Sequence, residues 1–210
     1  MIYKNIDSVN NPLFKKCWDI YCSNFPLTER RELIEQKQIF KTYSSGNSNN
    51  SNVNSNNSEY IFLALLKKCT DKDTNFIIVD NVPCVLVGIL TYWNFSEVIY
   101  VEHLAINQIV QGMGIGKIAV DYLKECTQIK YNNKPLLLEI ELPNNFMTKR
   151  RESFYKKLDF KVNDHEHFQP CFHKGDEPLE MQIMTWPTIV SSETYSTFKK
   201  EQDNMMPHFY

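Results

Sequence analysis

The chain has 210 residues, of which 42% are hydrophobic and 23% are charged, and its formal net charge is −2. This length predicts a single domain, and the composition is typical of a globular protein with a sizeable core. Because the net charge is close to zero, the chain has no general electrostatic attraction to nucleic acids or to anionic membranes. We therefore expect neither a nucleic-acid partner nor a membrane partner.

The sequence contains no segment typical of membrane insertion or secretion. No apolar run approaches the roughly 18 residues that span a bilayer, and residues 1–20 lack the apolar core of a signal peptide. The six cysteines form no CxxC pair, and several lie in apolar runs such as PCVLVGIL. We therefore expect reduced thiols in a cytoplasmic protein.

Residues 12–41 have the apolar spacing of helices. Apolar side chains recur every three or four residues from Phe14 to Cys22, which gives one apolar stripe. A turn at Pro26 separates this helix from a second one, for which Thr28 is the candidate N-cap.

Residues 44–58, SSGNSNNSNVNSNNS, have low complexity and almost no apolar side chains. Ordering this segment would bury nothing that offsets the lost chain entropy. We expect a disordered surface insertion within one domain that spans residues 1–210.

The remaining chain changes between strand-like and helical patterning. Four runs rich in β-branched and aromatic residues are joined by short turns, which predicts antiparallel strands. Apolar residues then follow a helical period at 116–129, and a short basic helix is expected at 148–158, with the strand-like run PLLLEIEL between them. Further strands and a C-terminal helical tail at 190–210, capped by Ser191 or Ser192, complete an α+β fold with a mixed sheet. The expected strands are 59–66, 75–80, 83–95, 98–106, 135–142, 159–162 and 179–186.

The stretch 110–117, VQGMGIGK, contains three of the six glycines and lies between an expected strand and an expected helix. A P-loop would need a glycine in place of Gln111 and a hydroxyl in place of Ile118. A dinucleotide-binding fingerprint would need its third glycine one residue after Gly116, and the acids of the next strand lie in mid-strand. Both interpretations are therefore disfavoured.

A third type of loop fits the same residues. Gln111, Gly114 and Gly116 match the Q/R-x-x-G-x-G/A loop of the GNAT superfamily of N-acetyltransferases. The amides at a helix N-terminus favour an anion, and glycines let successive N–H groups point at a phosphate without a Cβ in the way. For this stretch taken alone, a glycine turn without a ligand is the alternative.

From about residue 14 to residue 187 the chain resembles one group of GNAT proteins in four blocks that occur in the same order. FPLTERR resembles the FPxxERR segment of that group, and YVEHLAINQIVQGMGIGK resembles its Y-x-E-H-x-A-I strand and acetyl-CoA loop. LEIELPNNFMTKRRESFYKKLDF and QPCFHKGDEPLEMQIMTWP resemble its later LEVE-x-P…RR-x-x-FY-x-x-L-G-F and QPPY-x-x-G segments. The resemblance implies a GNAT fold and direct acetyl transfer from acetyl-CoA to a primary amine. The alternative is a non-catalytic acyl-CoA-binding or interaction module with the same fold.

The resemblance also implies where acetyl-CoA would bind. Two parallel strands, 98–106 and 136–142, separate in this fold, and the pantetheine arm lies between them. A backbone N–H there would also stabilise the negative charge that develops on the thioester oxygen. The implied cofactor-binding residues are Leu104, Ala105, Ile106, Gln111, Gly112, Met113, Gly114, Ile115, Gly116 and Lys117.

Glu102 is the candidate base that removes a proton from the amine, and a water relay is the alternative. Strand alternation predicts that Tyr100, Glu102 and Leu104 share one face of the sheet and that His103 points to the other. A structural role is therefore expected for His103.

Two further glutamates and one tyrosine complete the implied site. Glu139 and Glu141 alternate on an otherwise apolar strand, and carboxylates are seldom buried without a partner. Both are therefore candidates for binding a cationic substrate or relaying a proton. The resemblance implies that Tyr155 protonates the leaving thiolate, and its neighbour Phe154 is expected to face a different side of the helix.

The sequence departs from the family pattern at three positions. Asp159 replaces the glycine of the L-G-F turn, and aspartate tolerates left-handed backbone better than most residues. Thr148 stands where many GNAT helices have a CoA-contacting asparagine, and Phe172 stands where QPPY has a tyrosine. Because the cofactor loop is intact, we expect CoA binding to be retained, while the substrate of the relatives is not carried over.

The stretch HEHFQPCFH offers His165, His167, Cys171 and His173 as metal ligands. Their spacings do not match a zinc-finger pattern, so no metal is expected. The expected partner is a small-molecule or peptidyl amine substrate, and the sequence leaves a homodimer open.

Overall fold

A computed structural model describes residues 1–44, 58–70, 73, 75–173 and 175–205. The insertion predicted at 44–58 lies outside the described residues, except at its two ends. In the described part of the chain, no helix is both long and apolar enough to cross a membrane.

The strands of the described residues form one mixed sheet. They are β1 (Ile2–Asn5), β2 (Glu59–Lys68), β3 (Ile77–Val79), β4 (Val82–Asn94), β5 (Ile99–Ile106), β6 (Leu136–Glu141), β7 (Lys161–Val162), β8 (His167–Gln169) and β9 (Leu179–Trp186). Their order is β1-β2-β4-β5-β6-β9-β7, with β3 beside β4 and β8 beside β9. Neighbouring strands are antiparallel except β5 and β6, which are parallel. This arrangement confirms the predicted α+β class with a mixed sheet.

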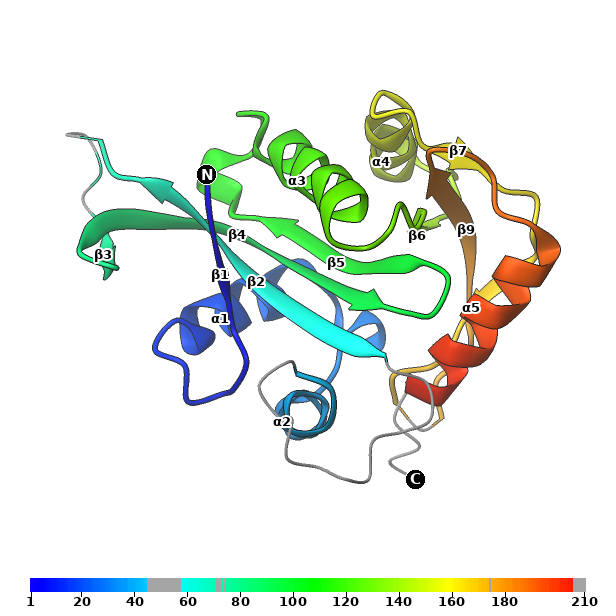
Figure 1. Ribbon diagram of the computed structural model, residues 1–210, viewed down its shortest axis with the longest axis horizontal. Helices are drawn as coiled ribbons and strands as arrows, with labels where there is room; N and C mark the ends of the chain where they lie inside the picture. The colour runs from blue at the N-terminus through cyan, green and yellow to red at the C-terminus, as the bar shows by residue number, and fades with distance from the viewer. Residues whose placement is uncertain (45–57, 71–72, 74, 174, 206–210) are drawn as a thin grey trace.

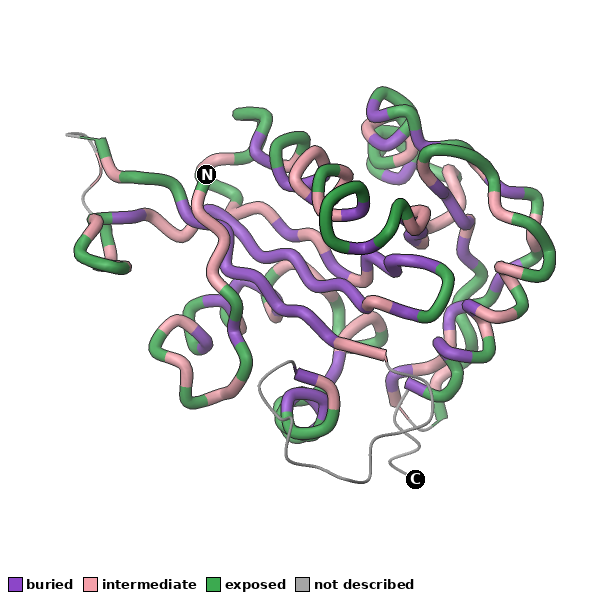
Figure 2. Tube along the Cα trace, viewed as in Figure 1, coloured by how far each residue is buried: buried purple, intermediate pink, exposed green. Residues whose placement is uncertain are grey.

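Helices cover both faces of this sheet (Figure 1). They are α1 (Phe14–Asn24), α2 (Leu33–Tyr43), α3 (Ile115–Ile129), α4 (Phe146–Lys156) and α5 (Ser192–Met205), with short 3-10 helices η1 (Leu27–Glu29) and η2 (Gln108–Val110). On one face, Phe14 of α1 and Phe198 of α5 join a hydrophobic cluster with Leu137 of β6. On the other face, Leu123 of α3 clusters with Leu138 of β6. The central strands are therefore buried along most of their length (Figure 2), which explains their nearly continuous apolar sequences.

The register of β4 against β5 contains a β-bulge. Thr91 of β4 lies opposite His103, and the next residue, Tyr92, lies opposite Val101. Glu102 is therefore the extra residue on β5 and has no partner on β4. Such a residue shifts the side-chain alternation of its strand by one position.

The bulge overturns the predicted alternation along β5. Glu102 contacts the segment that joins α1 and α2, and His103 packs against the ring of Tyr21 of α1, so both face the same side as Tyr100. Leu104 packs on the α3 side instead. The prediction that Leu104 shares a face with Glu102, and that His103 points away from it, was therefore wrong.

The N-cap predicted for α2 is wrong, whereas one of the two caps predicted for α5 is confirmed. Thr28 lies in η1 and does not cap α2. Glu32 is the N-cap instead, and its N–H donates to Oε2 of Glu35 at 2.6 Å. Glutamate is not a preferred N-cap, so the sequence favoured Thr28. At α5, the N–H of Thr194 donates to Oγ of Ser191 at 3.1 Å, which selects Ser191 from the two predicted caps.

Candidate functional site

β5 and β6 run side by side for three residues and then separate. Residues 99–101 of β5 pair with residues 136–138 of β6. Beyond this point, within the described residues, β5 pairs only with β4 and β6 pairs only with β9. This confirms the predicted separation of two parallel strands. It leaves the main chain of residues 104–106 without a strand partner on the β6 side, where an extended ligand could take that place.

The loop after β5 is held by side chains of polar residues. Nε2 of Gln111 donates to the carbonyl oxygen of Ile106 at 3.0 Å, which folds the loop back onto the end of β5. Gly112 and Gly114 have φ angles of +82° and +75°, values that favour glycine. A Cβ added to either glycine would have no other heavy atom within 4 Å, so the space beside the loop is open.

The N-terminus of α3 begins directly after this loop and has no side-chain cap. Its N-cap is Gly114, and no carboxylate occupies its first turn. The first amides of the helix therefore have no intrahelical acceptor and, together with the helix dipole, favour an anion. Lys117 is exposed there and pairs with Asp121 one turn further along. The open glycines and the uncapped amides fit the pyrophosphate of a CoA molecule.

Residues of α4 face the same region from the β6 side. The Phe154 ring would lie 3.3 Å from a Cβ on Gly116, so this glycine makes room for the ring. Tyr155 is 9% exposed, and its ring contacts those of Phe154 and Phe160 at centroid distances of 5.0 and 5.5 Å. The two rings touch, but Tyr155 packs against Phe160 in the core, whereas Phe154 is the residue that reaches the loop.

The hydroxyl of Tyr155 has no hydrogen-bond partner among the described residues. Burial raises its pKa to about 12, although the charge of Arg151 acts in the opposite direction. The phenol therefore stays protonated at neutral pH and remains able to donate its proton.

Two departures from the family pattern have clear local consequences. The hydroxyl of Thr148 accepts a hydrogen bond from the N–H of Asn145 at 3.1 Å, so it forms part of the cap of α4. Asp159 has a φ of +62°, so the turn expected for a glycine is kept.

A buried ion pair lies on the α1–α2 side of the separated strands. Nη1 of Arg31 donates to Oε2 of Glu102 at 2.8 Å, and Nη2 donates to Oε1. Nε1 of Trp93 donates to the same Oε1 at 3.2 Å. Burial alone would raise the pKa of Glu102, but the charge of Arg31 and the hydrogen bonds from His103 and Arg31 hold it well below its usual range. Glu102 is therefore a firmly ionised, weakly basic group, which argues against the predicted role of a free base.

Aromatic residues enclose this ion pair. The guanidinium of Arg31 lies over the rings of Tyr60, Trp93 and Phe172 at 5.7, 5.8 and 5.7 Å. Phe172 is 2% exposed, so the position that differs from the family pattern is a packing residue that covers Arg31. Nε2 of His103 lies 3.1 Å from the carbonyl oxygen of Glu29, which supports the predicted structural role of this histidine.

Glu139 is enclosed by protein groups. Its side chain is 3% exposed, and four donors occupy its two oxygens. The donors are Tyr100, His167, Gln169 and Gln202. With every acceptor position taken, Glu139 has no group left for a ligand, which argues against the predicted role in substrate binding.

Glu141 lies at the end of β6 and pairs with Arg151 of α4. Its side chain is 29% exposed, so it is the more accessible of the two predicted substrate-binding glutamates. Its ion pair joins α4 to the open end of the separated strands, and a cationic substrate would compete with Arg151 for it.

The histidine-rich segment is distributed over three different contacts. His165 stacks on Tyr195 at 4.2 Å, His167 binds Glu139, and Nε2 of His173 lies 2.7 Å from the carbonyl oxygen of Leu27. Among the residues that the structure describes, no three His, Cys, Asp or Glu side chains are grouped for a metal ion. These histidines therefore attach their segment to α5, to β6 and to η1.

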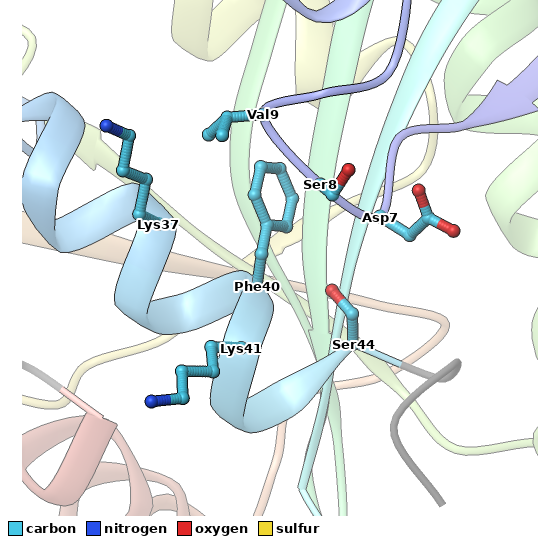
Figure 3. Close-up of a pocket in the computed structure, with 7 residues that line it drawn as sticks. All are labelled: Asp7, Ser8, Val9, Lys37, Phe40, Lys41 and Ser44. Carbon is cyan, nitrogen blue, oxygen red and sulfur yellow. The ribbon is translucent and has the colours of Figure 1, made fainter.

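An open depression of about 300 Å³ lies elsewhere, between α2 and the segment before α1 (Figure 3). Asp7, Ser8 and Val9 line one side, and Lys37 and Phe40 lie on the helix side. It shares no residue with the separated strands or the glycine loop, so geometry gives no reason to place the chemistry there.

Three of the solved structures that resemble this chain cover most of its length. A protein of the GNAT family from Bacteroides thetaiotaomicron has a TM-score of 0.69 and 24% identity, over 96% of this chain and 95% of its own. Arabidopsis thaliana NAA60, solved in complex with a bisubstrate analogue, has a TM-score of 0.56 and 11% identity, over 88% of this chain and 97% of its own. A tandem GNAT protein from the clavulanic acid biosynthesis pathway has a TM-score of 0.51 and 10% identity, over 80% of this chain and 46% of its own. No protein-family model and no curated protein matches the chain.

Proposed function

We propose that this chain, which has the GNAT fold, transfers an acetyl group from acetyl-CoA to the primary amine of a small molecule or peptide. The main support is a single geometric feature. The unpaired main chain at 104–106 and the uncapped N-terminus of α3 are joined by one short loop. One elongated ligand with an extended amide arm and a pyrophosphate would fit both places.

Main-chain groups would bind acetyl-CoA, the acetyl donor. Residues 104–106 would hydrogen-bond the pantetheine arm, and the loop Gln111–Lys117 would surround the pyrophosphate with amides. A backbone N–H near Ala105 would also polarise the thioester carbonyl as negative charge develops on its oxygen. These contributions depend on backbone position and not on a particular side chain.

Tyr155 would supply the proton for the leaving group. In direct transfer, the amine nitrogen forms a bond to the acetyl carbon while the carbon–sulfur bond breaks. The sulfur then takes a proton, and the buried phenol of Tyr155, with its pKa raised to about 12, carries one at neutral pH. The amine loses its own proton to water, and the phenolate of Tyr155 regains a proton from water, which restores the starting state.

We propose that Glu102 positions Arg31 and the bulge, and that a water relay removes the proton of the amine. Two hydrogen bonds from Arg31 and one from Trp93 occupy the carboxylate of Glu102. A base held in this way would have to break a buried ion pair before it could accept a proton, and doing so is costly.

The engaged state of Glu102 also favours a second candidate function. A protein that keeps the donor cleft but has no free base could bind acyl-CoA without turning it over. This non-catalytic module would bind acyl-CoA as the enzyme does, but it would not transfer the acyl group to an amine.

Calorimetry with CoA and acetyl-CoA, followed by a free-thiol release assay, separates the two functions. The assay needs a panel of polyamines, amino acids, aminoglycosides and peptides. CoA binding with amine-dependent thiol release supports the enzyme. Binding without release across the panel supports the non-catalytic module, and absence of binding rejects both.

A further inference from the structure

A buried polar network lies at the point where β5 and β6 separate, and the proposed chemistry does not use it. Glu139 is the first residue of β6 beyond the last parallel pair. The hydroxyl of Tyr100, on β5, donates to its Oε2 at 2.7 Å and so bridges the two strands. Gln202 of α5 donates to Oε1 at 2.5 Å, and Gln169 of β8 donates to Oε2 at 2.8 Å. His167 of β8 binds Oε1 through Nε2.

The partners of His167 indicate which of its ring nitrogens donate. The single hydroxyl proton of Tyr195 goes to the carbonyl oxygen of Glu166 at 2.9 Å, because a carbonyl can only accept. The same hydroxyl lies 3.0 Å from Nδ1 of His167 and must therefore accept a hydrogen bond from it. Toward Nε2, the acceptor is the Glu139 carboxylate, whose two oxygens already receive three other donors. In this arrangement both ring nitrogens face acceptors, which is the contact pattern of an imidazolium.

Both groups are deeply buried, so a charge on either one depends on its partner. The side chains of His167 and Glu139 are 0% and 3% exposed. Burial would raise the pKa of Glu139, but the hydrogen bond and charge of His167 lower it. Tyr195 and Phe198 of α5 contribute the rings next to His167, at 5.9 and 6.0 Å. Within the described residues, Glu139 is the one carboxylate that contacts the imidazole ring.

Charged residues of α5 point to other partners. Nζ of Lys199 donates to the carbonyl oxygen of Phe168 at 2.9 Å and also pairs with Asp203. The carboxylate of Glu201 accepts from N and Oγ of Ser96, in the turn between β4 and β5, at 3.0 and 2.9 Å. The helix is thus attached to β8, to β6 and to the turn before β5, and it crosses the point of separation.

We propose that His167 and Glu139 are positioning residues. As an imidazolium–carboxylate pair, they attach α5 and β8 to the point where β5 and β6 separate and fix the geometry of the cleft. Tyr100 transmits this constraint to β5. The charge state follows from the contacts alone, whereas the effect on the cleft rests on the proposed function.

The charge state can be measured by nitrogen-15 NMR of the full chain. The chain has five histidines, and a His167→Gln variant identifies the signals of this ring. We expect two ring N–H signals that persist at pH 8, where an ordinary imidazole with a pKa of about 6.5 is neutral. In a Glu139→Gln variant one of them should disappear. A wild-type ring that shows the signals of a neutral tautomer at pH 8 overturns the proposal.

The positioning role is tested by CoA affinity in Glu139→Gln and Tyr100→Phe. We expect the Kd for CoA to rise about tenfold in both, because a small displacement of the strands misplaces the ligand. The Tyr100→Phe variant should keep both imidazolium signals, so it tests the bridge even if Glu139→Gln does not fold. Glu193→Gln is the matched control, since this exposed glutamate in the first turn of α5 does not contact Glu139, and its CoA affinity should be unchanged.

The outcomes separate this proposal from the proposed function. Folded Glu139→Gln and Tyr100→Phe proteins with wild-type CoA affinity overturn the positioning role. A wild-type protein that does not bind CoA rejects the proposed function and the positioning role with it, and the NMR result still decides the charge state of His167.

Discussion

Arg31 and Glu102 are 71 residues apart in the sequence and form a two-contact ion pair in which each side chain is 1% exposed. The pair joins the segment between α1 and α2 to the bulge of β5, directly beside the separated strands. A buried charge that loses its partner is strongly destabilising. This pair therefore links the stability of the fold to the position of the candidate site.

Glu102→Gln should destabilise the protein, because it leaves the charge of Arg31 buried without a counter-charge. We expect a loss of about 3–5 kcal/mol in the free energy of unfolding at pH 7. Urea denaturation of the variant and of Glu97→Gln, an exposed control, measures this loss. Equal stability of Glu102→Gln and wild type would contradict a stabilising role for the ion pair.

The same ion pair predicts how stability changes with acid. The pKa of Glu102 is lowered by folding from its ordinary value of 4.5. The stabilisation is therefore fully present above that ordinary value and is lost as the pH falls toward the lower pKa of the folded state. We expect wild type to lose stability more steeply than Glu102→Gln below about pH 4.5, as measured by thermal unfolding at a series of pH values.

Gly114→Ala should weaken CoA binding. Its φ of +75° is strained for alanine by roughly 1–2 kcal/mol, so the loop is expected to move away from its present backbone conformation. Gly175→Ala is the control, because Gly175 also has a positive φ, of +90°, with open space around it, but lies outside the glycine loop. Calorimetry should show a higher Kd only for Gly114→Ala. The pyrophosphate assignment fails if even Gly114→Glu leaves the affinity of a folded protein unchanged.

Tyr155→Phe should lower kcat and leave CoA affinity unchanged. The variant keeps the buried ring and removes the proton donor, and loss of such a group typically costs about 10²-fold or more in rate. Tyr3→Phe is the control, since Tyr3 also has a pKa raised to about 12 but stacks on Tyr122, away from α4. The thiol-release assay with the best amine of the panel makes the comparison. An unchanged kcat would remove Tyr155 from the proposed chemistry.

Gly88→Ala should displace β5, the strand proposed to bind acetyl-CoA. A Cβ on Gly88 would lie 2.4 Å from the carbonyl oxygen of Ala105, and a backbone atom cannot move aside cheaply. We expect a destabilisation of about 1–3 kcal/mol together with a higher Kd for CoA. Denaturant unfolding and calorimetry check both effects. A loss of stability without a loss of affinity would show that residues 104–106 do not hold the ligand.

Local patterns were enough to predict most of the sheet and the glycine loop before α3. Runs of β-branched residues marked the long strands, and the glycines of Gln111–Gly116 marked the turn into α3, because backbone preference and apolar period are encoded within a few residues. Short edge strands such as β1 and β8 escaped prediction, since three or four residues give too little periodic signal.

The face of each β5 side chain could not be predicted. The bulge at Glu102 depends on the register between β4 and β5, and that register is a property of two strands together. One displaced residue moved His103 to the side of Glu102 and moved Leu104 to the opposite side. A rule of strict alternation cannot predict such a shift.

The sequence by itself determined most of the longer strands and helices and which loop could hold an anion, because these properties depend on neighbouring residues. Only the tertiary structure decided which acidic groups are free. Arg31 occupies Glu102, and His167 with Tyr100 occupies Glu139, so two of the three glutamates predicted for the site are ion-paired or hydrogen-bonded in the interior. The chemical state of a buried carboxylate is set by partners that are distant in sequence, since only charges and donors within a few ångströms offset the loss of water.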